Sequence, residues 1–213
     1  MKNRLVYAIL TGALLWACGH DEKKAATLLE EVRSDESGIT FQNTVQQQGE
    51  LNVLNYTYFF NGGGVAVGDL NNDGLADIYF SANQVSNKLY LNKGDWKFED
   101  ITDKAGVAAS EGWKTGVTLA DVNQDGWLDI YVCRSMRVEP QLRRNLLFIN
   151  NKDLTFTEKA AEYGIADDSY STQAAFFDYD NDGDLDMYLV VNQILRSVNP
   201  SIFKEKITKK KFL

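Results

Sequence analysis

The sequence has few of the residues that catalytic and cross-linking chemistry commonly uses. Its 213 residues contain one histidine, His20, two cysteines, Cys18 and Cys133, and two prolines. Two isolated cysteines and one histidine do not form a zinc-binding spacing or a disulfide framework. Neither a nucleophile elbow nor a phosphate-binding loop is present. These absences argue against the common hydrolase, nucleotide-binding and zinc-dependent classes.

Positive charge is also scarce. Twenty-two Lys and Arg face 30 Asp and Glu, so the formal net charge is −8. A nucleic acid is therefore excluded as the expected partner, because binding to phosphate backbones needs a basic surface. The ten Tyr, eleven Phe and sixteen Gly favour strands and tight turns over long helices.

No apolar run is long enough to span a bilayer, which takes about 20 residues. The longest N-terminal run, "LVYAILTGALLW", has twelve, follows Lys2 and Arg4, and ends at Ala17-Cys18. This order predicts a signal peptide over residues 1–17. "LWAC" resembles a bacterial lipobox, in which the cysteine receives lipid. An ordinary buried helix is the alternative.

Lipidation of Cys18 would tether the protein to a membrane surface without inserting it. We therefore expect an exported outer-membrane lipoprotein with a linker over residues 18–27. Loss of Lys2 and Arg4 with the leader changes the net charge from −8 to −10. "GHDEKK" after the leader resembles signals for exposure on the cell surface, and both surface and periplasmic orientations stay open. Cys133, in "DIYVCRS", is expected to be a buried strand residue.

One unit recurs along the chain. "DLNNDGLADIYF" begins at Asp69, "DVNQDGWLDIYV" at Asp121 and "DYDNDGDLDMYL" at Asp178. "NKLYLNKGDWKFEDITDKAGV" follows the first and "NLLFINNKDLTFTEKAAEYGI" the second. A period near 50 residues with several short strands is typical of a β-propeller blade.

Each unit predicts four antiparallel strands, which in the first unit cover 65–67, 78–81, 88–91 and 96–101. "LEEVRSDESGI", residues 29–39, weakly echoes "FEDITDKAGV", which predicts an outer strand before the first full unit. Residues 28–193 thus hold about two full blades plus partial ones. A non-repeat tail with five lysines occupies 194–213. Since propellers need about four to eight blades, we expect an all-β, incomplete propeller and a partial chain.

The acidic loops repeat one spacing of oxygen-bearing side chains. Positions 1, 3, 5 and 9 are Asp69, Asn71, Asp73 and Asp77; Asp121, Asn123, Asp125 and Asp129; and Asp178, Asp180, Asp182 and Asp186. With a backbone carbonyl at position 7 and water, these oxygens reach the six to eight ligands that Ca²⁺ prefers, and magnesium is the second choice. Glycine at position 6 permits the sharp turn.

Two other interpretations of these loops fit the sequence less well. Asp, Asn and Gly are also ordinary turn formers, but two carboxylates about 4 Å apart repel by roughly 4 kcal/mol at an effective dielectric of 20, and the spacing occurs three times. An EF-hand would need Glu at position 12 and flanking helices. Position 12 here is Phe80, Val132 and Leu189, within apolar strand-like runs.

The repeated segments resemble FG-GAP, or VCBS, repeats, as found in integrin alpha chains and bacterial surface proteins. "KLYLNKGDWKFEDITDKAGV" is similar to the cartilage acidic protein, ASPIC/UnbV-type branch. The resemblance covers about residues 38–193. It implies a calcium-stabilised β-propeller with about one Ca²⁺ per loop, held by the twelve positions named above. Asn at position 3 departs from the pattern and should weaken the first two loops relative to the third.

The resulting functional expectation is a non-enzymatic, surface-anchored scaffold that binds a protein or glycan at its propeller face. The alternative is part of a polysaccharide lyase or hydrolase whose catalytic site lies in missing blades. We expect no catalytic residue within this chain. Trp113 and Trp127 are expected in blade cores, with stacking on a sugar as the alternative.

Overall fold

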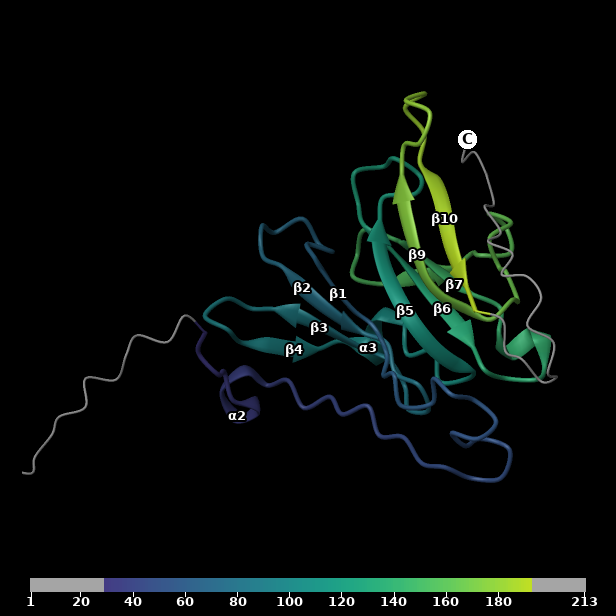
Figure 1. Ribbon diagram of the computed structural model, residues 1–213. Helices are drawn as coiled ribbons and strands as arrows, with labels where there is room; N and C mark the ends of the chain where they lie inside the picture. Colours follow the sequence, from purple (N-terminus) through teal and green to yellow (C-terminus); the bar gives the residue numbers. More distant parts are fainter. Residues whose placement is uncertain (1–28, 193–213) are drawn as a thin grey trace, which may run out of the picture. The chain divides into compact units, whose positions relative to one another are not determined.

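The structure is a computed structural model that describes residues 29–192 (Figure 1). The predicted signal peptide, the lipidation site Cys18, the linker and the lysine-rich tail lie outside the described residues. Contacts divide the chain after Val32, and the fold below is that of the unit that begins at Arg33.

The described chain is all-β, as predicted, and its strands form three antiparallel sheets. The first sheet has the order β1-β2-β3-β4 and the second β5-β6-β7-β8, while the third contains β9 and β10. The strands are β1 Val65–Gly68, β2 Asp77–Phe80, β3 Lys88–Asn92, β4 Phe98–Asp100, β5 Trp113–Ala120, β6 Asp129–Ser135, β7 Leu146–Asn150, β8 Phe156–Glu158, β9 Ser171–Phe177 and β10 Asp186–Val191. Each sheet follows chain order, so it is built from consecutive hairpins, as in a propeller blade.

The first strands of the three sheets are neighbours in space. Figure 1 shows β5 beside β9, and their contact is polar as well as apolar. Thr115 Oγ1 donates to the carbonyl of Ser171 at 2.9 Å, and Thr118 Oγ1 donates to the carbonyl of Ala174 at 2.6 Å. Neighbouring sheets therefore meet along their first strands.

The core lies between the faces of neighbouring sheets. Strand β6 is buried along its whole length, and its alternate residues face opposite ways. Ile130 and Val132 pack with residues of the first sheet, whereas Tyr131 and Cys133 pack with residues of the third. Burial on both faces explains the continuous apolar run of this strand. Cys133 is completely buried and free, as expected.

The helices in the described part of the chain are short: α2 Ser34–Ser37 before the first sheet, α3 Thr102–Ala105 just after β4, and the 3₁₀ helix η1 Pro140–Leu142 between β6 and β7. The helices α2 and α3 each end at a glycine in the left-handed region, Gly38 and Gly106. The echo between 29–39 and the end of the first unit is thus a helix–glycine turn. The outer strand predicted at 29–39 was wrong, because residues 34–37 form α2 and Gly38 takes the left-handed conformation that ends it.

The fourth strand of the first sheet is shorter than predicted. Trp96 was expected to begin it, but it lies in the preceding turn with a positive φ of 58° and is largely exposed. The strand starts at Phe98 and ends at Asp100, since Ile101 already leads into α3. Trp113, by contrast, is 1% exposed and packs against Phe59 and Tyr56, so its core role is confirmed.

Candidate metal centre

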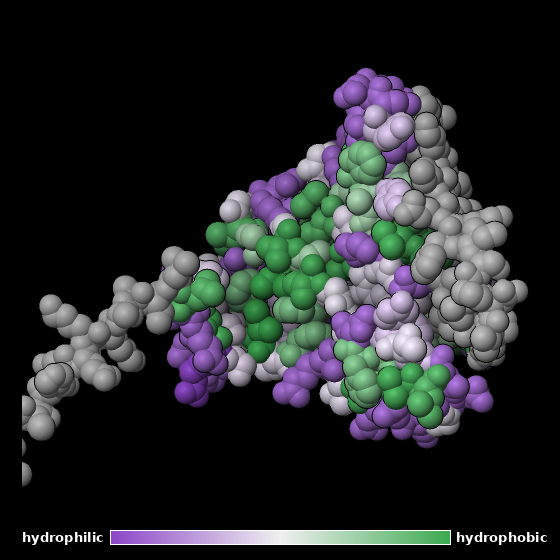
Figure 2. All heavy atoms as spheres, viewed as in Figure 1, coloured by the Kyte–Doolittle hydropathy of each residue, from purple (hydrophilic) through white to green (hydrophobic). Residues whose placement is uncertain are grey.

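Each acidic loop connects the first two strands of its sheet. Figure 1 shows the third loop at the tip of the β9–β10 hairpin, and Figure 2 shows that this tip is strongly hydrophilic. The position-12 residues lie in β2, β6 and β10, so the structure has strands where an EF-hand would have a helix.

Backbone conformation makes the three loops alike. The glycine at position 6 has a φ of 85°, 84° or 91° in Gly74, Gly126 and Gly183, a region that glycine enters at little cost. Position 4 is left-handed as well, with φ values of 56° to 58° in Asn72, Gln124 and Asn181. The glycine turn was predicted from the sequence, whereas the second left-handed residue was not.

The first aspartate of each loop organises the turn. In the first loop the carboxylate of Asp69 accepts the N–H groups of Asp73 at 3.2 Å and Gly74 at 2.8 Å. The carboxylate of Asp73 then accepts the N–H of Leu75 at 2.8 Å. The second and third loops repeat these contacts at 2.8 to 3.2 Å. The acidic side chains therefore fix the backbone conformation of each loop through hydrogen bonds to its own N–H groups.

The ninth position places a carboxylate at the start of a buried strand. Asp77 is 0% exposed, and its two oxygens accept the N–H groups of Leu70 at 2.9 Å and Asn92 at 2.8 Å. Asp129 is 1% exposed and accepts the N–H groups of Val122 at 3.1 Å and Asn150 at 2.8 Å. A fixed carboxylate thus lies beneath each of these two loops.

Burial and, to a smaller extent, the other carboxylates of the same loop raise the pKa of both buried carboxyls, to about 6 for Asp129, despite the opposing backbone hydrogen bonds. A buried anion among like charges is costly unless an opposite charge is near it. The donor set therefore fits a bound cation, which would offset this cost.

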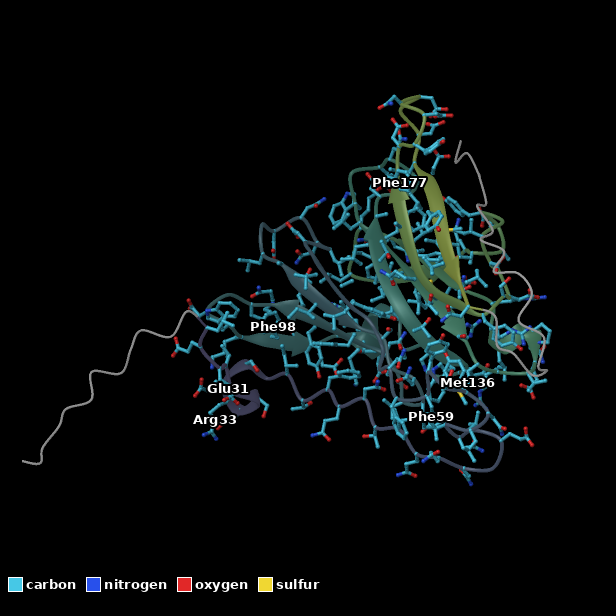
Figure 3. The ribbon with its side chains drawn as sticks, in the orientation of Figure 1. Glu31, Arg33, Phe59, Phe98, Met136 and Phe177 are labelled. Carbon is cyan, nitrogen blue, oxygen red and sulfur yellow. The ribbon has the colours of Figure 1, made fainter. Side chains whose placement is uncertain are left out.

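The third loop brings its acidic groups closest together. Asp178, Asp180 and Asp186 each offer an oxygen within 4.8 Å of the other two. Ligand oxygens around one Ca²⁺, each about 2.3–2.6 Å from the ion, span comparable separations. Figure 3 shows the oxygen-bearing side chains of this loop gathered beyond Phe177. Asp182, the fourth predicted ligand, is outside this group of three.

The first two loops differ at position 3. Asn71 Nδ2 donates to Asp73 at 2.9 Å, and Asn123 Nδ2 donates to Asp125 at 3.1 Å. Each amide thereby offsets part of the charge of its neighbouring carboxylate. With Asn in place of Asp at position 3, neither loop forms a cluster of three carboxylates like that of the third loop among the described residues. Lys152, from the β7–β8 turn, adds an ion pair of 3.2 Å with Asp125. The lysine contact was not foreseen, because it joins distant residues.

Neighbouring loops are joined by side-chain amides at position 4. Asn72 Nδ2 donates to the carbonyl of Gly126 at 3.1 Å, and Gln124 Nε2 donates to that of Gly183 at 2.8 Å. Position 4 of one loop thus contacts the glycine at position 6 of the next. The recurrence of an amide at position 4 was the sequence signal for this contact, and it was missed.

The opposite ends of the first strands border a cavity of about 290 Å³. Its lining includes Tyr58, Trp113, Thr115, Thr172 and Gln173. Trp113 is buried and Tyr58 is 42% exposed, so the tyrosine offers the accessible ring. The cavity and the acidic loops are therefore at opposite ends of the same strands.

Comparison with known proteins is consistent with the repeat geometry. The family model described as "FG-GAP-like repeat" matches residues 69–132 and 139–189, which together exceed half of the chain. The chain belongs to the FG-GAP-like repeat family. The resemblance inferred from the acidic loops is thus confirmed, and its matched segments contain all three of them.

This FG-GAP repeat chain is also similar to cartilage acidic protein 1. It is 37% identical to the Xenopus tropicalis protein over 116 residues, which cover 54% of this chain and 17% of that protein. It is 38% identical to the Homo sapiens protein over 81 residues, which cover 38% of this chain and 12% of that protein. The matched part is thus a small fraction of these relatives.

Proposed function

We propose that this FG-GAP repeat chain is a calcium-stabilised, non-enzymatic propeller scaffold. The observation that carries the proposal is the repeated hairpin loop with a fixed carboxylate at its base. When bound, Ca²⁺ would supply positive charge that offsets the repulsion among the loop carboxylates. The repeat family and the cartilage acidic protein relatives suggest an adhesion-type scaffold.

The twelve predicted ligands have different local roles in this proposal. Asp69, Asp121 and Asp178 hold the turn through backbone N–H groups and keep oxygen lone pairs for the ion. The ninth-position aspartates fix the loop to the sheet. Positions 3 and 5 complete the oxygen set: Asn71 and Asp73, Asn123 and Asp125, and Asp180 and Asp182.

The proposed partner is a protein or glycan that contacts the end of the blades opposite the acidic loops. The cavity there combines the exposed ring of Tyr58 with the polar side chains of Asn61, Thr172 and Gln173. Aromatic rings with hydroxyl and amide groups suit both kinds of ligand. We further propose export and attachment to the outer membrane through lipidated Cys18. No helix among residues 29–192 is long and apolar enough to cross a membrane.

Thermal unfolding with 10 mM Ca²⁺ and with a chelator tests the calcium proposal. Extracellular calcium modules have Kd values of about 10⁻⁴ to 10⁻³ M. Binding then stabilises the folded state by roughly 1.4 to 2.7 kcal/mol per site. We expect a clear rise in Tm in calcium and a smaller rise in the Asp178→Asn/Asp186→Asn variant.

Asp95→Asn is the matched control, because Asp95 is an exposed turn aspartate outside the acidic loops. This variant should keep the full response to calcium. Equal Tm values for the parent chain in calcium and in chelator would refute the proposal. An equal response in the Asp178→Asn/Asp186→Asn variant would remove the third loop from the binding sites.

A further inference from the structure

The three acidic loops are connected by hydrogen bonds that run from one sheet to the next. Asn72, at position 4 of the first loop, donates from Nδ2 to the carbonyl of Gly126 in the second loop at 3.1 Å. Gln124, at position 4 of the second loop, donates from Nε2 to the carbonyl of Gly183 in the third loop at 2.8 Å. Each of these contacts holds a loop from outside, in addition to the loop's own side chains.

The accepting peptide group is also held by predicted ligands of its own loop. The peptide between Gly126 and Trp127 donates its N–H to the carboxylate of Asp125 at 3.0 Å, while its carbonyl accepts from Asn72. The N–H of Gly126 donates to Asp121 at 2.8 Å. Because a peptide group is planar, a rotation of this peptide would disturb its contact with the ligand and its contact with the neighbouring loop together.

The donating residue is fixed by the first aspartate of its own loop. Asn72 has a left-handed φ of 56°, and the N–H of the next residue, Asp73, donates to Asp69 Oδ1 at 3.2 Å. The second loop repeats this arrangement around Gln124, which has a φ of 57°. A movement of the first aspartate would therefore redirect the amide that contacts the next loop.

A buried asparagine makes a second connection between the first two loops. Asn150, at the end of β7, is 3% exposed. Its Nδ2 donates to the carbonyl of Leu70 in the first loop at 2.8 Å and to that of Leu128 in the second at 3.1 Å. Its backbone N–H donates to Asp129, and the N–H of Leu70 donates to Asp77. Asn150 thus connects the groups that hold the ninth-position carboxylates of both loops.

We propose that the acidic loops bind Ca²⁺ cooperatively, because Asn72, Gln124 and Asn150 transmit the conformation of one loop to the next. This inference rests on the calcium proposal above. An ion held by one loop favours the conformation in which that loop meets its neighbour's amide or carbonyl. The contact then pre-organises the neighbouring loop, which has less conformational freedom to lose when it binds its own ion. The effect is reciprocal between the two loops.

Calcium titrations of the isotope-labelled 213-residue chain, followed by NMR, test the proposal. The amide signals of Gly74, Gly126 and Gly183 report on the three loops separately, since each N–H donates to the first aspartate of its own loop at 2.8 to 3.0 Å. Asp121→Asn removes a ligand of the second loop. In this variant we expect the first loop, followed at Gly74, to bind Ca²⁺ at least about fivefold more weakly, at the lower end of the range for coupled sites.

A double-mutant cycle isolates the part of this effect that the hydrogen bonds carry, because Asp121→Asn also removes a negative charge near the first loop. Asn72→Gly/Asn150→Ala removes both connections between the first two loops and changes no charge. In this background the effect of Asp121→Asn on the first loop should shrink by roughly threefold. Asn72→Gly alone should give part of this decrease. Since Asn72 is exposed, this single variant tests the proposal even where Asn150→Ala prevents folding.

Two control variants distinguish coupling from local damage. Asn72→Gln gives the first loop the residue that already makes this contact in the second loop, with nearly the same φ, and should keep the coupling of the parent chain. Asn92 has the place of Asn150 in the first sheet, and its Nδ2 donates to the carbonyl of Ala76 in its own loop at 2.9 Å. Asn92→Ala should therefore change the affinity of the first loop equally with and without Asp121→Asn.

The possible failures of the two proposals are distinguishable. Loop amides that do not respond to Ca²⁺ at about ten times the expected Kd would refute the calcium proposal and the coupling with it. Binding at all three loops, with the affinity of the first loop unchanged or higher in Asp121→Asn, would overturn the coupling alone. An effect of Asp121→Asn that is equally large in Asn72→Gly/Asn150→Ala would also overturn it, since the loops would then interact only through their charges.

Discussion

Lys114 joins the first two sheets through a buried charge. It lies in β5 and is completely buried, and its Nζ donates to the carbonyl of Val85 at 2.9 Å. No carboxylate forms an ion pair with it among residues 29–192. Burial and, to a smaller extent, the nearby guanidinium groups of Arg134 and Arg137 lower the pKa of Lys114 to about 8. Burying the charged ammonium of Lys114 therefore lowers the free energy of unfolding.

The pKa sets the size of that cost and its pH window. A decrease from 10.5 to about 8 corresponds to about 3 kcal/mol. Below pH 8 both the folded and unfolded states carry the proton, so the full cost is present. Between pH 8 and 10.5 the unfolded state binds more protons, so the free energy of unfolding rises with pH. Lys114 should therefore make the protein more stable in mild alkali.

Lys114→Met removes the charge and keeps most of the side-chain volume. It loses one hydrogen bond, worth about 1 kcal/mol, so the free energy of unfolding at pH 7 should rise by roughly 2 kcal/mol. The advantage should vanish by about pH 10. Urea unfolding at pH 7, 8, 9 and 10 measures both effects. Lys104→Met, a change at an exposed lysine, is the control and should follow the parent.

Parallel pH profiles for the parent chain and Lys114→Met between pH 8 and 10 would refute the assignment of a depressed pKa. A lower stability of Lys114→Met at pH 7 would have a different meaning. It would show that the hydrogen bond to Val85 stabilises the fold by more than the buried charge destabilises it.

Three further predictions concern a close backbone contact, a buried hydroxyl and the N-terminal cysteine. Gly63→Ala should lower the free energy of unfolding by about 3 kcal/mol or more, since the new Cβ would lie 1.9 Å from the carbonyl oxygen of Ser81. Gly49→Ala, in open space with a φ of 56°, should cost about 1 kcal/mol, and equal losses of the two variants in urea unfolding would contradict the contact. Tyr79→Phe should cost about 2 kcal/mol, because it leaves the buried Asn87 amide and Val107 carbonyl without their partner. Tyr188 has the same place in β10, and its hydroxyl has no hydrogen-bond partner among residues 29–192, so Tyr188→Phe should change the free energy of unfolding by less than about 0.5 kcal/mol; matching losses would show that the two hydroxyls are equally bonded. Cys18→Ser should abolish incorporation of a labelled fatty acid and release the protein from membranes, and retention of label would exclude lipidation at this residue.

Local patterns predicted the sheets because each strand carries its own signal. The alternation in "DIYVCRS" places Tyr131 and Cys133 on one face of β6 and Ile130 and Val132 on the other, and both faces are buried. Within the segment at 29–39, residues 34–37 form α2 and Gly38 ends it in the left-handed region. The prediction of a strand was wrong because the residues that echo the first unit match its helix α3 and Gly106, not its strand β4.

The acidic spacing predicted which side chains share a loop, but not their different environments. Asp77 and Asp129 are the same residue type as the other loop aspartates, yet among the predicted ligands of the first two loops only these two are buried. Their burial depends on the third strand, which contributes a backbone N–H from 15 residues downstream of Asp77 and 21 residues downstream of Asp129. Every residue type except proline has a backbone N–H, so the amino-acid sequence does not indicate which residue donates to these carboxylates. The contact of Lys152 with Asp125 was also missed, because the two residues are far apart in the sequence.

The strength of a cation site in this fold therefore depends on more than its acidic residues. Counting carboxylates predicts that the third loop binds most tightly, because Asp180 replaces an asparagine and joins a cluster of three. Within residues 29–192, however, Asp186 accepts one backbone N–H, from Tyr179, whereas Asp77 and Asp129 each accept two. Asp186 is also more exposed than these two aspartates. This difference acts in the opposite direction, because a carboxylate that is held less firmly is a less well-placed ligand.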